Sequence, residues 1–231
     1  MDGSVIAVWV DNRCCSYEAV NVIYAQRITS SGLPLWTPNG IVVAAALGGV
    51  NQPVLVSDAM NGAIVASKER YATVIYAHHI TAAGSVSGGA IATGSGYRYV
   101  SSIDSDGSGG GIVAWSDTRG GSGDIYVQRV RADGTVDPAW THNGVALCTA
   151  AGDQVVPMIV SDGAGGAIAT WYDKRSGSSY DIYAQHVLPD GAVDLEHCCA
   201  LLACESLQTL RRCRFVVPIA LLRVQEKDGD L

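Results

Sequence analysis

The chain has 231 residues, of which 48% are hydrophobic and 16% are charged, so it can bury a core and does not have the composition of a disordered protein. Its formal net charge of -7 argues against nucleic-acid binding, which needs clustered Lys and Arg. No apolar run reaches the roughly 18 to 20 residues that span a bilayer, so no membrane span is expected.

Four copies of one sequence unit follow each other along the chain. Each copy contains one tyrosine at the same place, and the period is roughly 48 to 57 residues. These tyrosines are Tyr24, Tyr76, Tyr126 and Tyr183. The first copy reads GSVIAVWVDNR and then VIYAQRI, and the weaker second copy reads NGAIVASKER and then VIYAHHI. The third and fourth copies contain SDGSGGGIVAWSDTR with DIYVQRV, and SDGAGGAIATWYDKR with DIYAQHV.

Each copy contains signals for four short strands. In the fourth copy, an apolar run at 155–161 ends in a turn, and the glycine-rich stretch that follows lets the chain reverse into a second strand at 167–173. Residues 181–187 have the alternation of a third strand, and the third copy shows a fourth strand at 144–150. Antiparallel four-stranded units without helical periodicity predict an all-β, β-propeller-like fold of about four blades. A solenoid or two stacked sandwiches are the alternatives.

The two ends of the repeated region depart from the complete unit. The first copy lacks its first strand, and the fourth copy loses the repeat after Asp194. We therefore expect a four-repeat β-propeller-like domain at 1–195 and a divergent C-terminal tail at 196–231. The tail segment 216–222, VVPIALL, resembles VVPMIVS at 155–161, so it is a candidate closing strand. The alternative is that the sequence is a fragment of a larger propeller.

The sequence motif that the copies share is SDGxGGxIxxWxDxR, then DIYAQR, then DG, then WxxNG. It resembles the repeats of bacterial secreted and cell-surface proteins with β-propeller-like domains, and the resemblance covers residues 2 to about 194. The resemblance implies an extracellular or cell-surface protein that serves as a binding or scaffold module. The sequence itself shows no signal peptide.

Asp and Arg stand two residues apart directly after the second strand of three copies. The pairs are Asp11 with Arg13, Asp117 with Arg119, and Asp173 with Arg175. Such a pair could clamp a sugar or a carboxylate. A group repeated in every blade is more often turn chemistry, in which Asp accepts from backbone N–H groups and Arg pairs locally. We therefore interpret these residues as structural, and the second copy has Glu69 and Arg70 at this point.

Tryptophan occupies two repeat positions. Trp9, Trp115 and Trp171 share one position, and Trp36 and Trp140 share the other. Repeated tryptophan more often packs neighbouring blades than it forms a sugar platform, and we assign the repeated tyrosines to the same structural role. The second copy has Ser67 at the first position and no tryptophan at the other, so its blade is expected to pack less firmly.

The aspartates of the SDG turns resemble the Asp-box turn of sialidase-type propellers, which is itself structural. They are Asp58, Asp106 and Asp162. The nearest approach to a calcium loop places Asp104, Asp106 and Ser108 in alternation, but its closing Glu is absent. We therefore predict no metal site, with these three residues as the nearest candidates, and no cofactor.

Histidine and cysteine form no recognisable catalytic or metal pattern. His79 and His186 stand where other copies have Arg27 and Arg129, which indicates a basic preference at the blade rim. The seven cysteines are an odd number without paired Cys-x-x-Cys spacing. Cys148 lies in an expected strand and is interpreted as a small hydrophobic residue.

The predicted function is a non-enzymatic extracellular binding or scaffold module whose partner is a glycan or a protein. One alternative is a glycan-processing hydrolase, sialidase-like or of another propeller type, with acids from several blades clustered at one end of the central channel. No catalytic residue can be named for it from sequence spacing. Another alternative is a protein–protein interaction platform, which predicts an exposed apolar patch.

Overall fold

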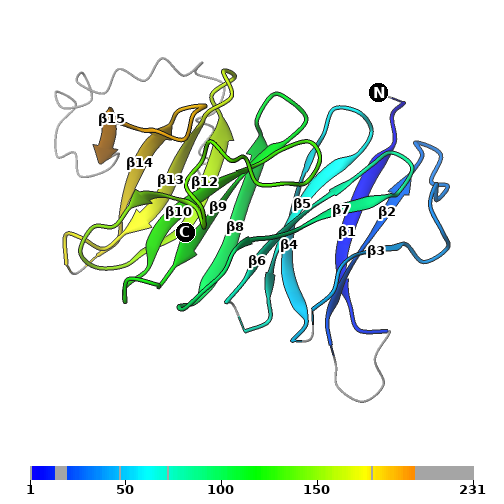
Figure 1. Ribbon diagram of the computed structural model, residues 1–231, viewed down its shortest axis with the longest axis horizontal. Coiled ribbons are helices and arrows are strands. Elements are labelled where there is room, and N and C mark those ends of the chain that lie inside the picture. The colour runs from blue at the N-terminus through cyan, green and yellow to red at the C-terminus, as the bar shows by residue number, and fades with distance from the viewer. Residues whose placement is uncertain (1, 14–19, 47, 72, 178, 201–231) are drawn as a thin grey trace, which may run out of the picture.

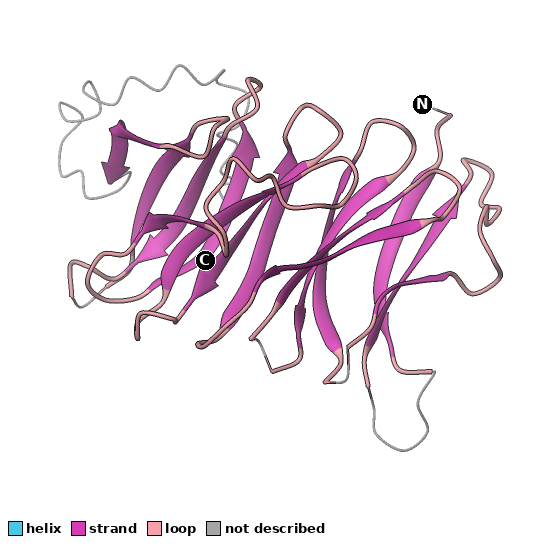
Figure 2. Ribbon diagram, in the orientation of Figure 1, coloured by secondary structure: helices cyan, strands magenta, loops and turns pink. Residues whose placement is uncertain are grey.

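The computed structural model describes residues 2–13, 20–46, 48–71, 73–177 and 179–200. These residues form strands joined by turns and loops (Figure 2). The described part of the chain contains no helix that is long and apolar enough to cross a membrane.

The strands form four antiparallel sheets, one for each sequence copy, and each sheet is built from consecutive strands. The first sheet contains β1 (Val5–Asp11), β2 (Val22–Ile28) and β3 (Ile41–Ala44). The second contains β4 (Val50–Ser57), β5 (Ala63–Glu69), β6 (Ile75–Ile80) and β7 (Val86–Ala92). The third contains β8 (Arg98–Ser105), β9 (Gly111–Asp117), β10 (Asp124–Val130) and β11 (Val145–Cys148). The fourth contains β12 (Gln154–Ser161), β13 (Ala167–Asp173), β14 (Asp181–Val187) and β15 (Val193–Ala200). The prediction of an all-β fold with four antiparallel blades is confirmed.

The sheets stack in sequence order into a row, and the first and fourth sheets lie at its opposite ends (Figure 1). The first strand of each later sheet packs on the preceding sheet, so that β4 contacts β1 and β2, β8 contacts β4 and β5, and β12 contacts β8, β9 and β10. Three hydrophobic clusters fill the three spaces between neighbouring sheets. In the second and third sheets, the alternating side chains of the strands therefore serve two different interfaces, one on each face of the sheet.

The two end sheets differ in how complete they are. The first sheet has three strands, and β1 corresponds to the second strand of the other sheets, as the sequence predicts. The fourth sheet has a last strand, β15 (Val193–Ala200), although the repeat pattern is lost after Asp194. This strand crosses the expected boundary between the domain and the tail at 195/196. The candidate closing strand 216–222 lies outside the described residues.

The first strands of the second, third and fourth sheets each contain a bulge, and each stands at an edge of its sheet. The register with the neighbouring strand shifts between residues 51 and 54, 100 and 102, and 155 and 158. Pro53 and Pro157 lie inside two of these bulges, and the preceding Gln52 and Val156 have φ angles of 52° and 54°. Proline lacks a backbone donor, so an edge strand with a bulge is where a sheet tolerates it.

Gly144 makes a close contact with the buried Trp115. It has a φ of +100°, and a Cβ added there would lie 2.5 Å from the indole ring. We expect Gly144→Ala to lower the free energy of unfolding by about 2–4 kcal/mol, from backbone strain and overpacking together. Chemical denaturation measures this loss. Gly163→Ala is the control, because Gly163 has a φ of +76° and no atom within 4 Å of the added Cβ. An equal loss in both variants would contradict the role of the tryptophan contact.

Candidate functional site

The residues singled out by the repeat form one compact side-chain group per sheet. In the third sheet, Trp115 Nε1 donates to Asp117 Oδ2 at 3.1 Å, and the Arg119 backbone N–H donates to Asp117 Oδ1 at 2.9 Å. The Arg119 guanidinium pairs with Asp117 and lies 4.0 Å from the centre of the Tyr126 ring. The rings of Trp115 and Tyr126 stack with their centres 6.2 Å apart. The charge of Arg119 is therefore compensated within its own sheet.

The same group recurs in the first and fourth sheets. Its members are Trp9, Asp11, Arg13 and Tyr24 in the first sheet, and Trp171, Asp173, Arg175 and Tyr183 in the fourth. In the second sheet, Ser67 takes the place of the tryptophan opposite Tyr76, and the buried Ser67 Oγ has no hydrogen-bond partner in the described structure. Glu69 takes the place of the aspartate and accepts a hydrogen bond from the Thr73 hydroxyl at 2.6 Å.

The third sheet adds a buried arginine that the sequence analysis missed. Arg98 begins β8 opposite Asp117, its Nε lies 2.9 Å from Asp117 Oδ2, and the two side chains are 1% and 0% exposed. Burial lowers the pKa of Arg98 below its usual value. Burial raises the pKa of Asp117, but hydrogen bonds from Arg119 and Trp115 outweigh it, so the net pKa lies below the usual value. Its place opposite Asp117 follows from the register of β8 with β9, for which the sequence RYVSSIDS gives no clear signal.

The aspartate of each SDG turn, between the first and second strands of a sheet, pairs with a basic residue on the third strand of the same sheet. One carboxylate oxygen of each turn aspartate accepts two backbone N–H groups at 2.7–2.9 Å. The other oxygen lies 2.9 Å from the basic residue, and the pairs are Asp58 with His79, Asp106 with Arg129, and Asp162 with His186. Burial raises the pKa of the Asp58 carboxyl, but its hydrogen bonds outweigh this and the net pKa is lowered. The aspartate partner gives a physical reason for the basic preference at His79 and His186.

The nearest calcium candidates do not converge on one point. Asp106 is engaged by its turn and by Arg129, and Ser108 donates its backbone N–H to Asp106. Asp104 Oδ2 instead accepts the backbone N–H of Ser161 in the fourth sheet at 2.8 Å. Among the described residues, no group of three His, Cys, Asp or Glu could hold a metal ion.

The second tryptophan position joins neighbouring sheets. Trp36 Nε1 donates to the Ala82 carbonyl and Trp140 Nε1 donates to the Pro189 carbonyl, both at 3.1 Å. Each indole thus connects its sheet to a turn of the following sheet. Between the second and third sheets, the Ser87 hydroxyl makes a 2.7 Å hydrogen bond to a backbone carbonyl instead.

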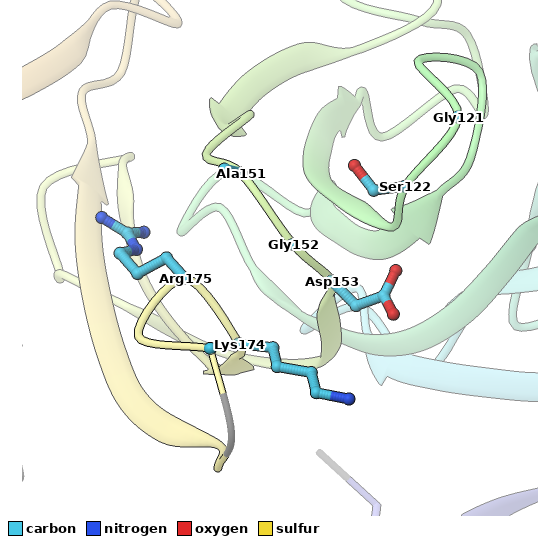
Figure 3. A pocket seen from close by; sticks show the side chains of 8 residues that line it. Gly121, Ser122, Ala151, Gly152, Asp153, Lys174 and Arg175 are labelled. Carbon is cyan, nitrogen blue, oxygen red and sulfur yellow. The ribbon is translucent and has the colours of Figure 1, made fainter.

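A shallow hollow of about 590 Å³ lies where loops of the third and fourth sheets meet (Figure 3). Its lining residues are Gly121, Ser122, Ala151, Gly152, Asp153, Lys174, Arg175 and Gly177. The Lys174 N–H donates to the Asp153 carbonyl at 2.8 Å, and the Gly123 N–H donates to Asp153 Oδ1 at 3.0 Å. Asp153 therefore ties three loops together. Sequence spacing could not reveal this hollow because its loops belong to different sheets.

The hollow presents an ammonium group, a carboxylate and a hydroxyl. Figure 3 shows the side chains of Lys174 and Asp153 projecting to one side and that of Arg175 projecting away from them. Lys174 Nζ lies 5.6 Å from the centre of the Tyr180 ring, and Tyr180 makes an edge contact with Tyr172 at 6.3 Å. Both tyrosines are about half exposed. These groups can bind a ligand that carries hydroxyls and negative charge.

Cys148 lies in β11, beside the core between the third and fourth sheets, and is partly buried. Its sulfur lies 2.9 Å from an Arg175 guanidinium nitrogen and 3.8 Å from Asp173 Oδ2. The interpretation as a small hydrophobic residue therefore describes its packing but omits these polar contacts.

No protein-family model matches the chain. No curated protein matches it either. Among solved structures, the chain is similar to a protein assigned as TolB from Agrobacterium tumefaciens, with 17% sequence identity and a TM-score of 0.43. The match covers 82% of this chain and 60% of that one, so the chain spans about 60% of the length of that structure. A similarity at this level supports no statement about ligand or activity.

Proposed function

We propose that the chain is a non-enzymatic binding module in which the stacked sheets are a scaffold and the hollow binds an acidic saccharide. The proposal rests on the ammonium group of Lys174. The arginines of the repeated groups pair with aspartates, whereas no carboxylate of the described residues lies within ion-pair distance of the Lys174 ammonium. A cation in this setting can donate to a ligand carboxylate, and Asp153 can accept from sugar hydroxyls.

The arrangement of the carboxylates favours binding over hydrolysis. A glycosidase uses two carboxyl groups on either side of the scissile bond. Asp153 is the one carboxylate among the residues lining the hollow. The repeated aspartates Asp117 and Asp173 already accept hydrogen bonds from tryptophan and arginine. On this basis the glycan-processing hydrolase is the less favoured alternative.

A protein ligand is the second candidate, and a specific surface favours it. Val156, Met158 and Tyr172 are 51%, 59% and 48% exposed on the fourth sheet, at the end of the row. We also propose an extracellular or cell-surface location, which rests on the resemblance of the repeats to those of secreted proteins.

Titration calorimetry with uronate-containing oligosaccharides and their neutral counterparts tests the saccharide proposal. Lys174→Ala is expected to weaken binding of the acidic sugars about tenfold or more, because one charge-assisted hydrogen bond is lost. Asp153→Asn should also weaken binding. Asp190→Asn is the control, since Asp190 lies in the turn after β14, at the opposite end of that strand. Equal affinity for acidic and neutral sugars, or an unaffected Lys174→Ala variant, would overturn the proposal.

A further inference from the structure

The strand β1 exposes side chains that its counterparts bury. Val5 is 61% exposed, whereas Ala63 and Ala167 at the same position of the second and fourth sheets are 0% exposed. Val10 is 40% exposed, whereas its counterparts Lys68 and Ser116 in the second and third sheets are 9% and 5% exposed. The counterpart in the fourth sheet, at the other end of the row, is Tyr172, which is 48% exposed. The composition of β1, VIAVWVD, is nevertheless that of a strand buried on both faces.

The exposed strand also has an edge without a partner in the described structure. In the other three sheets, the corresponding edge pairs with the bulged first strands β4, β8 and β12. The first sheet ends at β1 on this side. A strand edge flanked by apolar side chains on both faces is a template for the addition of another strand.

The bulged strands define which sequence fits this edge. In β4 and β12, a proline lies in the bulge and apolar residues follow it. The chain has seven prolines, and the other described ones lie outside the strands. The remaining proline is Pro218, in the sequence FVVPIALL at 215–222, which lies outside the described residues. Aligned on proline, this segment matches QVVPMIVS of β12.

We propose that residues 215–222 bind the edge of β1 in the same molecule and form the first strand of the first sheet. The register of β12 with β13 places Leu222 opposite Val5, Leu221 opposite Ile6 and Ala220 opposite Ala7. The inference does not depend on the proposed saccharide site, because β1 and the hollow belong to different sheets.

Side-chain sizes support this pairing. In the third sheet, a Cβ at Gly111 would lie 3.0 Å from Ile103 of β8, so a small residue there faces a large one. In the second and fourth sheets, Ala63 and Ala167 stand at the position of Gly111, and Leu55 and Ile159 stand at the position of Ile103. The first sheet has the large Val5 at the glycine position, and the segment 215–222 has the small Ala220 at the isoleucine position. The exchange of sizes preserves the packed volume.

The connecting residues are long enough for an intramolecular contact. The described chain ends at Ala200, in the last strand of the fourth sheet. Residues 201–214 can span about 46–50 Å when extended. Three sheet-to-sheet steps of about 10 Å each separate the fourth sheet from the first. The segment can therefore reach β1 without a second molecule.

Hydrogen exchange of the full chain, read by mass spectrometry on peptides covering 5–11, tests the proposal. We expect slow exchange in the wild type and about tenfold faster exchange in Leu221→Asp. Leu207→Asp, in the same tail but outside the segment, is the matched control and should leave exchange of β1 unchanged. Ala220→Ile should also raise exchange, and adding Val5→Ala should restore protection because the sizes match again.

Light scattering on the same samples decides which molecule supplies the strand. A monomer with Leu221-dependent protection of β1 supports the proposal. Fast exchange of β1 in the wild type, or protection that Leu221→Asp leaves intact, would overturn it. A dimer whose β1 protection falls on dilution would assign the strand to a second copy and overturn the intramolecular contact.

Discussion

Replacing Trp115 with alanine is expected to lower the free energy of unfolding by about 3–5 kcal/mol. The indole is fully buried in the cluster between the second and third sheets, and it lies beside Tyr126 and against Gly144. Its removal leaves a cavity between two sheets and takes a hydrogen-bond donor from Asp117. Because the indole belongs to the cluster that joins the second and third sheets, its loss weakens the packing of both sheets. Guanidinium denaturation followed by circular dichroism measures it.

Tyr97→Ala is the matched aromatic control for this variant. Tyr97 is 58% exposed, so its truncation is expected to change the free energy of unfolding by no more than about 0.5 kcal/mol. Similar losses of stability for Trp115→Ala and Tyr97→Ala would show that burial between the two sheets is not the cause of the loss.

Asp117→Asn should cost about 3–5 kcal/mol in the free energy of unfolding, although the two side chains have almost the same shape. The carboxylate pairs with both Arg98 and Arg119, and Arg98 is 1% exposed. The neutral amide leaves the buried guanidinium of Arg98 without a carboxylate. Thermal and chemical denaturation at neutral pH measure the loss. Asp11→Asn is the control, because the described first sheet has no arginine in the place of Arg98, and its loss should be smaller.

The contribution of the Asp117 ion pairs to the free energy of unfolding depends on pH with a definite sign. The pKa of Asp117 in the folded protein lies below the value of 3.8 for an unperturbed aspartate. A lowered folded pKa contributes stability that is fully present above the unfolded pKa and is lost as the pH falls through the folded pKa. The difference between the wild type and Asp117→Asn should therefore be constant from neutral pH to about pH 5 and shrink below pH 3.8. A difference that widens on acidification would contradict the ion pair.

The local parts of the fold could be predicted from the sequence because their signals are local. The expected strands 167–173 and 181–187 coincide with β13 and β14. Alternation of side chains and glycine-rich turns determine such strands within a few residues. The repeat pattern does not extend through β15, because this strand pairs with β14 through backbone groups, which need no particular side-chain pattern after Asp194.

The candidate site was predictable only where it repeats. The Trp–Asp–Arg group lies within five residues of sequence, so the pairs Asp117 with Arg119 and Asp173 with Arg175 were visible. Arg98 depends on the register between β8 and β9, which the spacing of residues does not give. The hollow depends on loops from two sheets, and Asp153 and Lys174 meet only after the sheets have stacked.

The row of sheets has a direction. Every internal sheet receives the first strand of the next sheet on one face and lays its own first strand on the preceding sheet. Ser102 and Ser116 of the third sheet accept backbone N–H groups of β12, but Met158 and Tyr172 stand at these positions in the fourth sheet. A copy of the third unit inserted after the third sheet would present the same two serines to β12. A unit added after the fourth sheet would instead meet Met158 and Tyr172, so its first strand would lack those serine contacts.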